Sequence, residues 1–80
     1  MGNIKTKLKI TNNLHVLRAE KKLTQQALAD AIGVTRLTVN SMEKGNYNPS
    51  LELAFRLAIY FEKDIKDIFT VESKNEKSIK

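Results

Sequence analysis

The sequence has no cysteine and only one histidine, His15. Without cysteine it can form neither a disulfide framework nor a thiolate metal site, and one histidine cannot supply the usual zinc or copper ligand sets. The residues present offer no combination of nucleophile, base and orienting group, which argues against an enzyme. We therefore expect a protein with no metal and no cofactor, in which His15 is an ordinary surface residue.

Long hydrophobic runs are missing as well. The longest uninterrupted apolar run is residues 57–61, whereas a membrane-spanning helix needs about 20 apolar residues and a signal-peptide core about 7–15. These absences predict a soluble, cytoplasmic protein in a reducing compartment, with no membrane partner. A chain of 80 residues removes only roughly 60% of its unfolded surface from water on folding, which leaves room for one modest core.

The net charge of +5 is unevenly distributed along the chain. Residues 1–50 carry eight basic and three acidic side chains, whereas residues 51–80 carry six of each. All of the excess positive charge therefore lies in the N-terminal part, as it does in proteins that bind nucleic acid or anionic membranes. A solvated lysine-rich face would give the same balance.

Apolar periodicity and capping residues predict five helices. The expected N-caps are, in chain order, Asn12 or Asn13, then Thr24, Thr35, Ser50 and Asp64. The first helix is expected to end near residues 21–22, and the third near Lys44. Gly33 and Gly45 follow the second and third helices, where a left-handed residue commonly ends a helix. The side chains expected to face inward are, in the second helix, Leu28, Ala31 and Ile32 and, in the fifth, Ile65, Ile68 and Phe69.

Alternation of polar and apolar side chains marks residues 7–11 and 69–73 as two strands. We expect them to pair into a small antiparallel sheet, which helices or a partner must cover because two strands alone are marginally stable. The expected organisation is a flexible N-terminus over residues 1–6, one domain over residues 7–73 and a disordered charged tail over residues 74–80.

The second and third predicted helices, residues 24–32 and 35–43, are joined through Gly33 and Val34 with the spacing of a helix-turn-helix. On a helical wheel, the third helix separates into a packed face, with Thr35, Thr38, Val39 and Met42, and an open face, with Arg36, Leu37, Asn40, Ser41 and Lys44. The open face can hydrogen-bond to base edges and phosphates in a major groove. Leu37 is apolar on this polar face, so it is either an ordinary exposed leucine or a contact for a thymine methyl group.

The sequence resembles the Cro/cI-type helix-turn-helix regulators, the Xre family, in Leu17 and Arg18, in residues 23–58, in Phe61 and in the segment DIKDIF. The resemblance covers about residues 12–69. It rests on Gln25 opening the second helix, Ala29 where two helices cross closely, Gly33 at the turn and Glu43 before a Lys-Gly pair. The resemblance implies a mainly α, five-helix, lambda-repressor-like DNA-binding domain. It is closest in pattern to small single-domain repressors of Gram-positive bacteria, which bind palindromic DNA operators as homodimers.

The same resemblance implies roles for individual residues. It assigns base reading to Arg36, Leu37, Asn40 and Ser41, and phosphate binding to Gln25, Thr35 and Lys44. It also pairs Arg18 with Glu43 as a partly buried ion pair. Gln25 and Thr35 could instead act only as capping residues, and Lys44 only as a solvated cation. Tyr47 either packs beneath its loop or offers its hydroxyl to a phosphate. The family often has glycine where this chain has Glu62, which raises the expectation of a different end to the fourth helix.

Several apolar side chains exceed what one small core can hide. They predict a symmetric homodimer through the fourth helix, the fifth helix and the sheet. The interface residues expected are Phe55, Ile59, Tyr60, Ile65, Phe69 and Val71.

Two other functions compete with DNA binding. Residues 1–6 fit the myristoylation pattern M-G-x-x-x-[ST], and the lysines at positions 5, 7 and 9 could add a basic patch for a membrane adaptor. The same fold could also serve as an antitoxin or another protein-interaction module. We expect a bacterial or phage DNA-binding transcriptional regulator, most simply a repressor.

Overall fold

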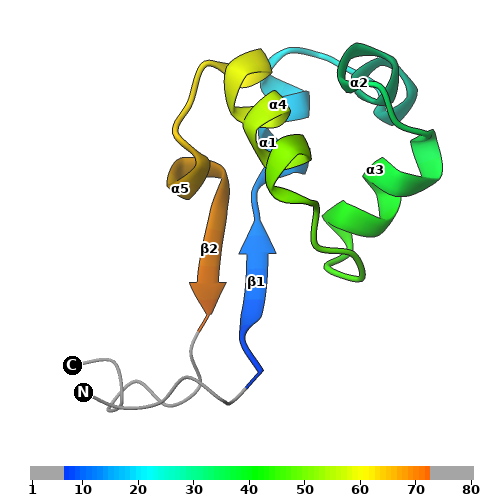
Figure 1. Ribbon diagram of the computed structural model, residues 1–80. Helices are drawn as coiled ribbons and strands as arrows, with labels where there is room; N and C mark the ends of the chain where they lie inside the picture. The colour runs from blue at the N-terminus through cyan, green and yellow to red at the C-terminus, as the bar shows by residue number, and fades with distance from the viewer. Residues whose placement is uncertain (1–6, 73–80) are drawn as a thin grey trace.

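The computed structural model describes residues 7–72, which form five helices and two strands. The segment expected to be flexible, residues 1–6, and the expected charged tail, residues 74–80, lie outside the described residues, as does the myristoylation pattern. The elements run in the order β1 (Lys9–Asn12), α1 (Leu14–Glu20), α2 (Gln25–Ile32), α3 (Arg36–Glu43), α4 (Leu51–Phe61), α5 (Ile65–Ile68) and β2 (Phe69–Glu72). The helices gather at one end, and the two strands project from them side by side (Figure 1).

The sheet is antiparallel, as predicted, and pairs Ile10 with Val71 and Asn12 with Phe69. Its bounds differ from the prediction because β1 begins at Lys9 instead of residue 7 and continues to Asn12. Phe69, which was expected both on the fifth helix and as the first residue of the second strand, begins β2, so the strand prediction is the correct one. Partner strands thus determine where the elements end, which local periodicity cannot show.

Capping chemistry confirms most of the predicted helix starts. The hydroxyls of Thr24, Thr35 and Ser50 each accept a hydrogen bond from the backbone N–H three residues later, at 3.0–3.2 Å. Asn13 occupies the N-cap of α1 but makes no side-chain capping bond, and Asp64 makes none at α5. At the start of α1 it is Asn12 Oδ1 that accepts from the Leu14 N–H, at 3.1 Å.

The core is a single cluster of side chains from all five helices. The buried members are Leu14, Leu17, Leu28, Ala29, Ile32, Val39, Met42, Leu53, Leu57, Ala58, Phe61 and Ile68. One residue expected to face inward from the second helix, Ala31, is exposed, so that prediction was wrong. Ala29, which the family resemblance placed at a close helix crossing, is buried. At 100° per residue Ala29 lies on the side of Leu28 and Ile32 that meets α3, whereas Ala31 lies on the other side.

Glu62 closes α4 in the left-handed conformation, with φ of 56° and ψ of 49°. The Lys63 N–H donates to the Ala58 carbonyl at 2.9 Å, the bond that glycine-terminated helices commonly make. The expectation that the end of α4 would differ without glycine is therefore wrong: the same closure forms with a side chain present.

We predict that Glu62→Gly raises the free energy of unfolding by about 0.5–1 kcal/mol. A residue with a Cβ is strained in the left-handed region, and glycine is not, although glycine's greater freedom in the unfolded chain offsets part of the gain. Urea denaturation measures the difference. Glu62→Ala is the matched control, since it removes the same carboxylate but keeps the Cβ, and an equal gain in both variants would contradict the argument.

Candidate nucleic-acid interface

The helices α2 and α3 are joined by a tight turn at Gly33. Gly33 has φ of 81°, and the N–H groups of Gly33 and Val34 both donate to the Ala29 carbonyl, at 2.9 and 3.0 Å. Only a residue without a Cβ adopts this φ freely, so the predicted glycine position is confirmed. Thr35 then caps α3, which makes this segment a helix-turn-helix.

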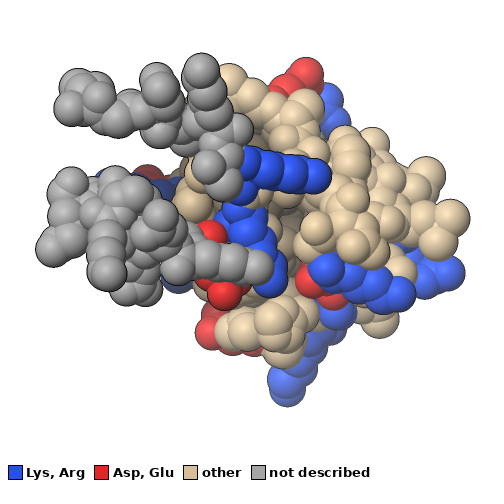
Figure 2. All heavy atoms as spheres, turned by 90° about the horizontal axis from the view of Figure 1, so that it is seen from below, with Lys and Arg blue, Asp and Glu red and all other residues tan. Residues whose placement is uncertain are grey.

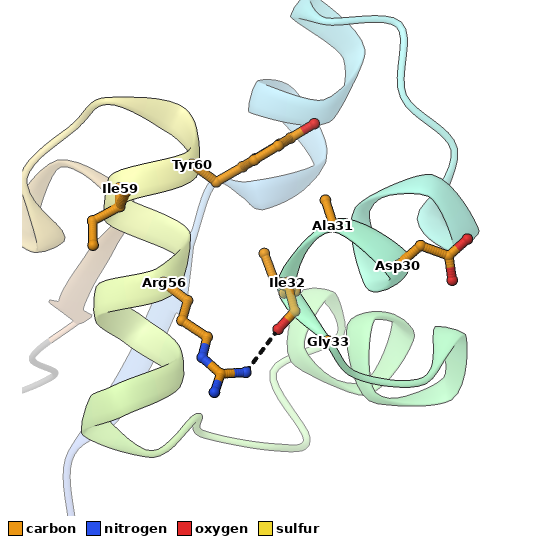
Figure 3. Close-up of a pocket in the computed structure, with 7 residues that line it drawn as sticks. All are labelled: Asp30, Ala31, Ile32, Gly33, Arg56, Ile59 and Tyr60. Carbon is orange, nitrogen blue, oxygen red and sulfur yellow. Dashed lines mark hydrogen bonds between the residues drawn. The ribbon is translucent and has the colours of Figure 1, made fainter.

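Arg56 on α4 fixes this turn to the rest of the domain (Figure 3). Its Nη1 donates to the Ile32 carbonyl at 3.1 Å, and its Nη2 contacts Glu52 at 2.7 Å. A Cβ placed on Gly33 would lie 3.2 Å from the same Nη1. The surrounding hollow, about 430 Å³ in volume, is shallow and mainly apolar and lies between α2 and α4. The turn is thus held against α4, which limits how α2 and α3 can move relative to it.

The open face of α3 is narrower than the helical wheel predicted. Val39 and Met42 are fully buried, and Arg36 and Leu37 are exposed, as expected. Thr35, expected on the packed face, is exposed because it precedes the helix, where wheel angles no longer apply. Asn40 and Ser41, expected on the open face, are half-buried.

Gln25 explains why Asn40 is half-buried. Its Nε2 donates to Asn40 Oδ1 at 3.2 Å and to Glu43 Oε1 at 3.1 Å, so one amide group links the start of α2 to two turns of α3. An amide NH₂ has two donors, and both are used here. The Gln25 side chain therefore acts within the protein, while the Asn40 NH₂ group keeps its donors for other partners.

Arg18 and Glu43 form a two-point ion pair between α1 and α3. Arg18 Nε lies 2.6 Å from Glu43 Oε2, and Arg18 Nη2 lies 3.0 Å from Glu43 Oε1. The two side chains are only 19% and 9% exposed, and Arg18 Nη1 also donates to the Leu23 carbonyl at 2.8 Å. Such planar, two-point pairing holds both partners in one orientation.

The environment shifts both titration equilibria toward the charged forms. The hydrogen bond with Glu43 raises the pKa of Arg18, against the opposing effect of burial. Burial alone would raise the pKa of Glu43, but hydrogen bonds from Arg18 and Gln25, together with the positive charge of Arg18, outweigh it and lower that pKa. The pair therefore stays ionised at neutral pH.

Asn12 has a second role at this site. The sequence predicted it only as a possible N-cap of the first helix. Its Nδ2 donates to the Met42 carbonyl at 2.8 Å, in the last turn of α3, while its backbone belongs to β1. Asn12, Arg18 and Gln25 thus all bond to the C-terminal turn of α3. Only a tertiary contact could identify this role, because 30 residues separate the partners.

Lys44 and Tyr47 lie beyond the C-terminal end of α3. Lys44 is the C-cap residue and is exposed, and Tyr47 is 44% exposed in the following loop. Figure 2, which views the molecule from below Figure 1, shows several Lys and Arg side chains on this face, with Asp and Glu side chains between them. The N-terminus of α3 adds a positive partial charge at Arg36. Arg36 at the start of α3 and Lys44 at its C-cap are both exposed cations, which suits an anionic polymer.

The residues expected at a dimer interface divide into two groups. Tyr60, Ile65 and Phe69 are half-buried against the protein's own core. Ile59, Phe55 and Val71 are exposed, by 75%, 52% and 49%. Leu51, which the sequence analysis did not select, is 71% exposed. Leu51, Phe55 and Ile59 are spaced by four residues and form one line along α4, which we call the α4 apolar stripe.

The described residues, 7–72, contain neither a cluster of metal ligands nor a helix that could cross a membrane. No three His, Cys, Asp or Glu side chains in this range come together as metal ligands could. No helix in the same range combines the length and apolar character needed to cross a membrane.

Similarity to known sequences agrees with this geometry. Residues 14–68 match the helix-turn-helix family HTH_3. An HTH-type transcriptional regulator of Methanocaldococcus jannaschii is 49% identical over 61 residues, which are 76% of this chain and 92% of that protein. The transcriptional repressor RstR of the cryptic phage CTXphi in Vibrio cholerae is 31% identical over 65 residues, which are 81% of this chain and 59% of the repressor.

Solved structures show the same fold. The transcriptional regulator VanUg superimposes with a TM-score of 0.72 over 92% of this chain and 100% of its own, at 24% identity. The restriction-modification controller protein C.AhdI of Aeromonas hydrophila superimposes with a TM-score of 0.61 over 68% of this chain and 78% of its own, at 33% identity. With the α2–turn–α3 geometry and a family match over most of its length, this protein belongs to the Xre family of helix-turn-helix transcriptional regulators.

Proposed function

We propose that this regulator is a repressor that binds a palindromic operator as a homodimer and reads it with Arg36, Leu37, Asn40 and Ser41. One observation carries the proposal: side chains from β1, α1 and α2 bond to the last turn of α3, while its N-terminal turn, with Arg36, stays open. A side chain can discriminate between bases only if its helix is held in one orientation. The naming of a relative, the CTXphi protein, as a repressor supports the direction of regulation.

The phosphate contacts follow from the positive helix ends. Thr35 and Gln25 stand at the N-termini of α3 and α2, where backbone N–H groups are free to donate to anions. Because both donors of the Gln25 amide are used within the protein, we assign its phosphate contact to the backbone N–H. Lys44 and Tyr47, both exposed, would reach phosphates beyond the C-terminal end of α3.

The dimer follows from the exposed apolar surface. The α4 apolar stripe and Val71 present large side chains to water in a single copy. A two-fold contact between two such stripes would bury them and repeat the interface on both copies. The interface would also include those parts of the half-buried side chains that the core leaves exposed; the residues are Tyr60, Ile65 and Phe69. Two α3 helices would then read half-sites about 34 Å apart on one face of the duplex.

Selection of bound sequences from a random duplex pool tests sequence-specific binding first. We expect a palindrome whose half-sites are about one helical turn apart. Transcription from a promoter that carries this palindrome is expected to fall when the protein is added. A pool that shows no enriched sequence would refute the proposed function.

Arg36→Ala is expected to weaken binding to the selected operator by about 1–3 kcal/mol and to relax the preference for one symmetric guanine pair. The guanidinium can donate two parallel hydrogen bonds to guanine O6 and N7, which alanine cannot replace. Titrations of operator and random duplex at two salt concentrations measure the effect.

Lys44→Ala is the matched control, because it removes a charge of the same sign from the C-cap of the same helix. We expect it to weaken binding to both duplexes similarly and to reduce the salt slope by about one unit per monomer. Equal losses on operator and random DNA for Arg36→Ala would instead assign Arg36 to a phosphate.

A further inference from the structure

Leu37 is an isolated apolar side chain on the open turn of α3. It is 65% exposed, whereas Val39 and Met42, the other apolar residues of this helix, are fully buried. Within the part of the chain that the structure describes, no packing contact requires a leucine at this position. The α4 apolar stripe does not include it, so a contact between two stripes would leave Leu37 in water.

The charges around Leu37 indicate what it meets. Arg36 precedes it, Lys44 follows at the end of the helix, and the N-terminus of α3 carries a positive partial charge. The single acidic side chain of α3, Glu43, is already paired with Arg18. A leucine among positive charges complements an apolar group that lies between rows of phosphates, and it does not complement the apolar face of a protein.

We propose that Leu37 reads the 5-methyl group of a pyrimidine in the major groove, an inference that rests on the proposed DNA-binding function. Base edges in this groove are otherwise polar, with donors and acceptors of hydrogen bonds, and the thymine methyl group is their apolar feature. A 5-methylcytosine carries the same group in the same place. The chemistry recognised is therefore a pyrimidine methyl, whichever base supplies it.

The position of Leu37 beside Arg36 locates this methyl group within the half-site. A helix rises about 1.5 Å per residue, less than the roughly 3.4 Å between base pairs. Consecutive residues at the start of α3 therefore address the same or neighbouring base pairs. The half-site is expected to place a 5-methylpyrimidine next to the guanine read by Arg36. Leu37 and Arg36 would then contact the same or adjacent base pairs.

The test uses the operator selected above and removes methyl groups one at a time. Each thymine of the half-site is replaced by deoxyuridine, which differs only in lacking the methyl. In a second set of duplexes each cytosine is replaced by 5-methylcytosine. For the wild-type protein we expect one deoxyuridine substitution to raise Kd about four-fold per half-site, the effect of one buried carbon. If the source is 5-methylcytosine, one methylated cytosine lowers Kd by a similar factor instead.

Leu37→Ala should abolish this sensitivity, so that duplexes with and without the methyl bind equally. Leu37→Met should keep it, because methionine also presents an apolar end. Val16→Ala is the matched control: Val16 is another exposed apolar residue, on α1, and its loss should leave the four-fold effect unchanged.

Two results would overturn the inference while leaving the proposed function intact. In the first, an operator is selected but no thymine or cytosine position responds to the methyl group. In the second, a position responds equally in the wild type and in Leu37→Ala, which would assign the methyl contact to another residue. Failure to select any operator would instead count against the proposed function itself.

Discussion

Ile59→Glu is expected to convert a dimer into a monomer, with the dimer Kd raised at least about 100-fold. Ile59 is 75% exposed and ends the α4 apolar stripe, so the substitution disturbs no packing within one copy. A two-fold interface contains this residue once from each copy, so the substitution places two carboxylates in it. Each of them would be buried without a counter-charge. Sedimentation at tens of micromolar measures the change.

The loss of the dimer should also appear in DNA binding. A monomer engages one half-site, whereas a dimer gains from the second half-site without a further diffusional step, an advantage of roughly 10²–10⁴. Ile59→Glu should therefore lose most of its operator affinity although α3 is unchanged.

Val16→Glu places the same charge on another exposed apolar position, on α1 and outside the stripe, and should remain a dimer. A wild-type protein that sediments as a monomer with and without operator would contradict the dimer. A dimer that persists in Ile59→Glu would move the interface away from α4.

Replacing Arg18 with alanine is expected to lower the free energy of unfolding by about 3 kcal/mol at neutral pH. The substitution removes both hydrogen bonds from the guanidinium to Glu43, whose side chain is only 9% exposed. A carboxylate left in that position without its counter-charge is destabilised by far more than a lost surface contact. Thermal and urea unfolding measure the loss.

The exposed pair between Lys9 and Glu72 provides the comparison. Its side chains are 62% and 53% exposed and 3.6 Å apart, so Lys9→Ala should change stability by less than about 0.5 kcal/mol. The double variant Arg18→Met with Glu43→Leu should be more stable than Arg18→Ala, because it leaves no unpaired charge. Equal effects of Arg18→Ala and Lys9→Ala would show that the buried position of the pair does not matter.

The same pair predicts how stability depends on pH. The pKa of Glu43 is lowered in the folded protein from its ordinary value of 4.5. A lowered pKa stabilises the fold above the ordinary value, and this stabilisation is lost as pH falls through the lowered pKa. The wild type should therefore lose more stability between pH 5 and the acid range than Glu43→Gln, in which this group no longer titrates. Parallel pH profiles of the two proteins would contradict the assignment.

Much of the candidate nucleic-acid interface could be predicted, because the sequence features that form its helix caps and its turn are local. The caps Thr24 and Thr35 bond to N–H groups three residues away, and Gly33 is needed at a single backbone conformation. The capping residues and the glycine lie in the same short segments whose ends and turn they form. They can therefore be recognised in the sequence without knowledge of the fold. The same holds for Arg36 and Leu37, whose exposure follows from helical periodicity.

Other features could not be predicted because they depend on which elements meet. No local pattern in the sequence predicts that Asn12 bonds to the end of α3. None predicts that the amide of Gln25 bonds to Asn40 and Glu43. In each case the hydrogen-bond partner belongs to another element, and local secondary-structure propensity does not predict which elements pack together.

The sequence alone determined the helix-turn-helix, its caps and turn, and the open turn that carries Arg36 and Leu37, because each depends on residues within about one helical turn of each other. Tertiary structure decided how firmly α3 is held and which apolar side chains remain outside. Asn12 reaches the Met42 carbonyl across 30 residues, and Gln25 reaches Glu43 across 18. Those contacts depend on the packing of whole elements, because a buried polar group must find its partner wherever the fold places one.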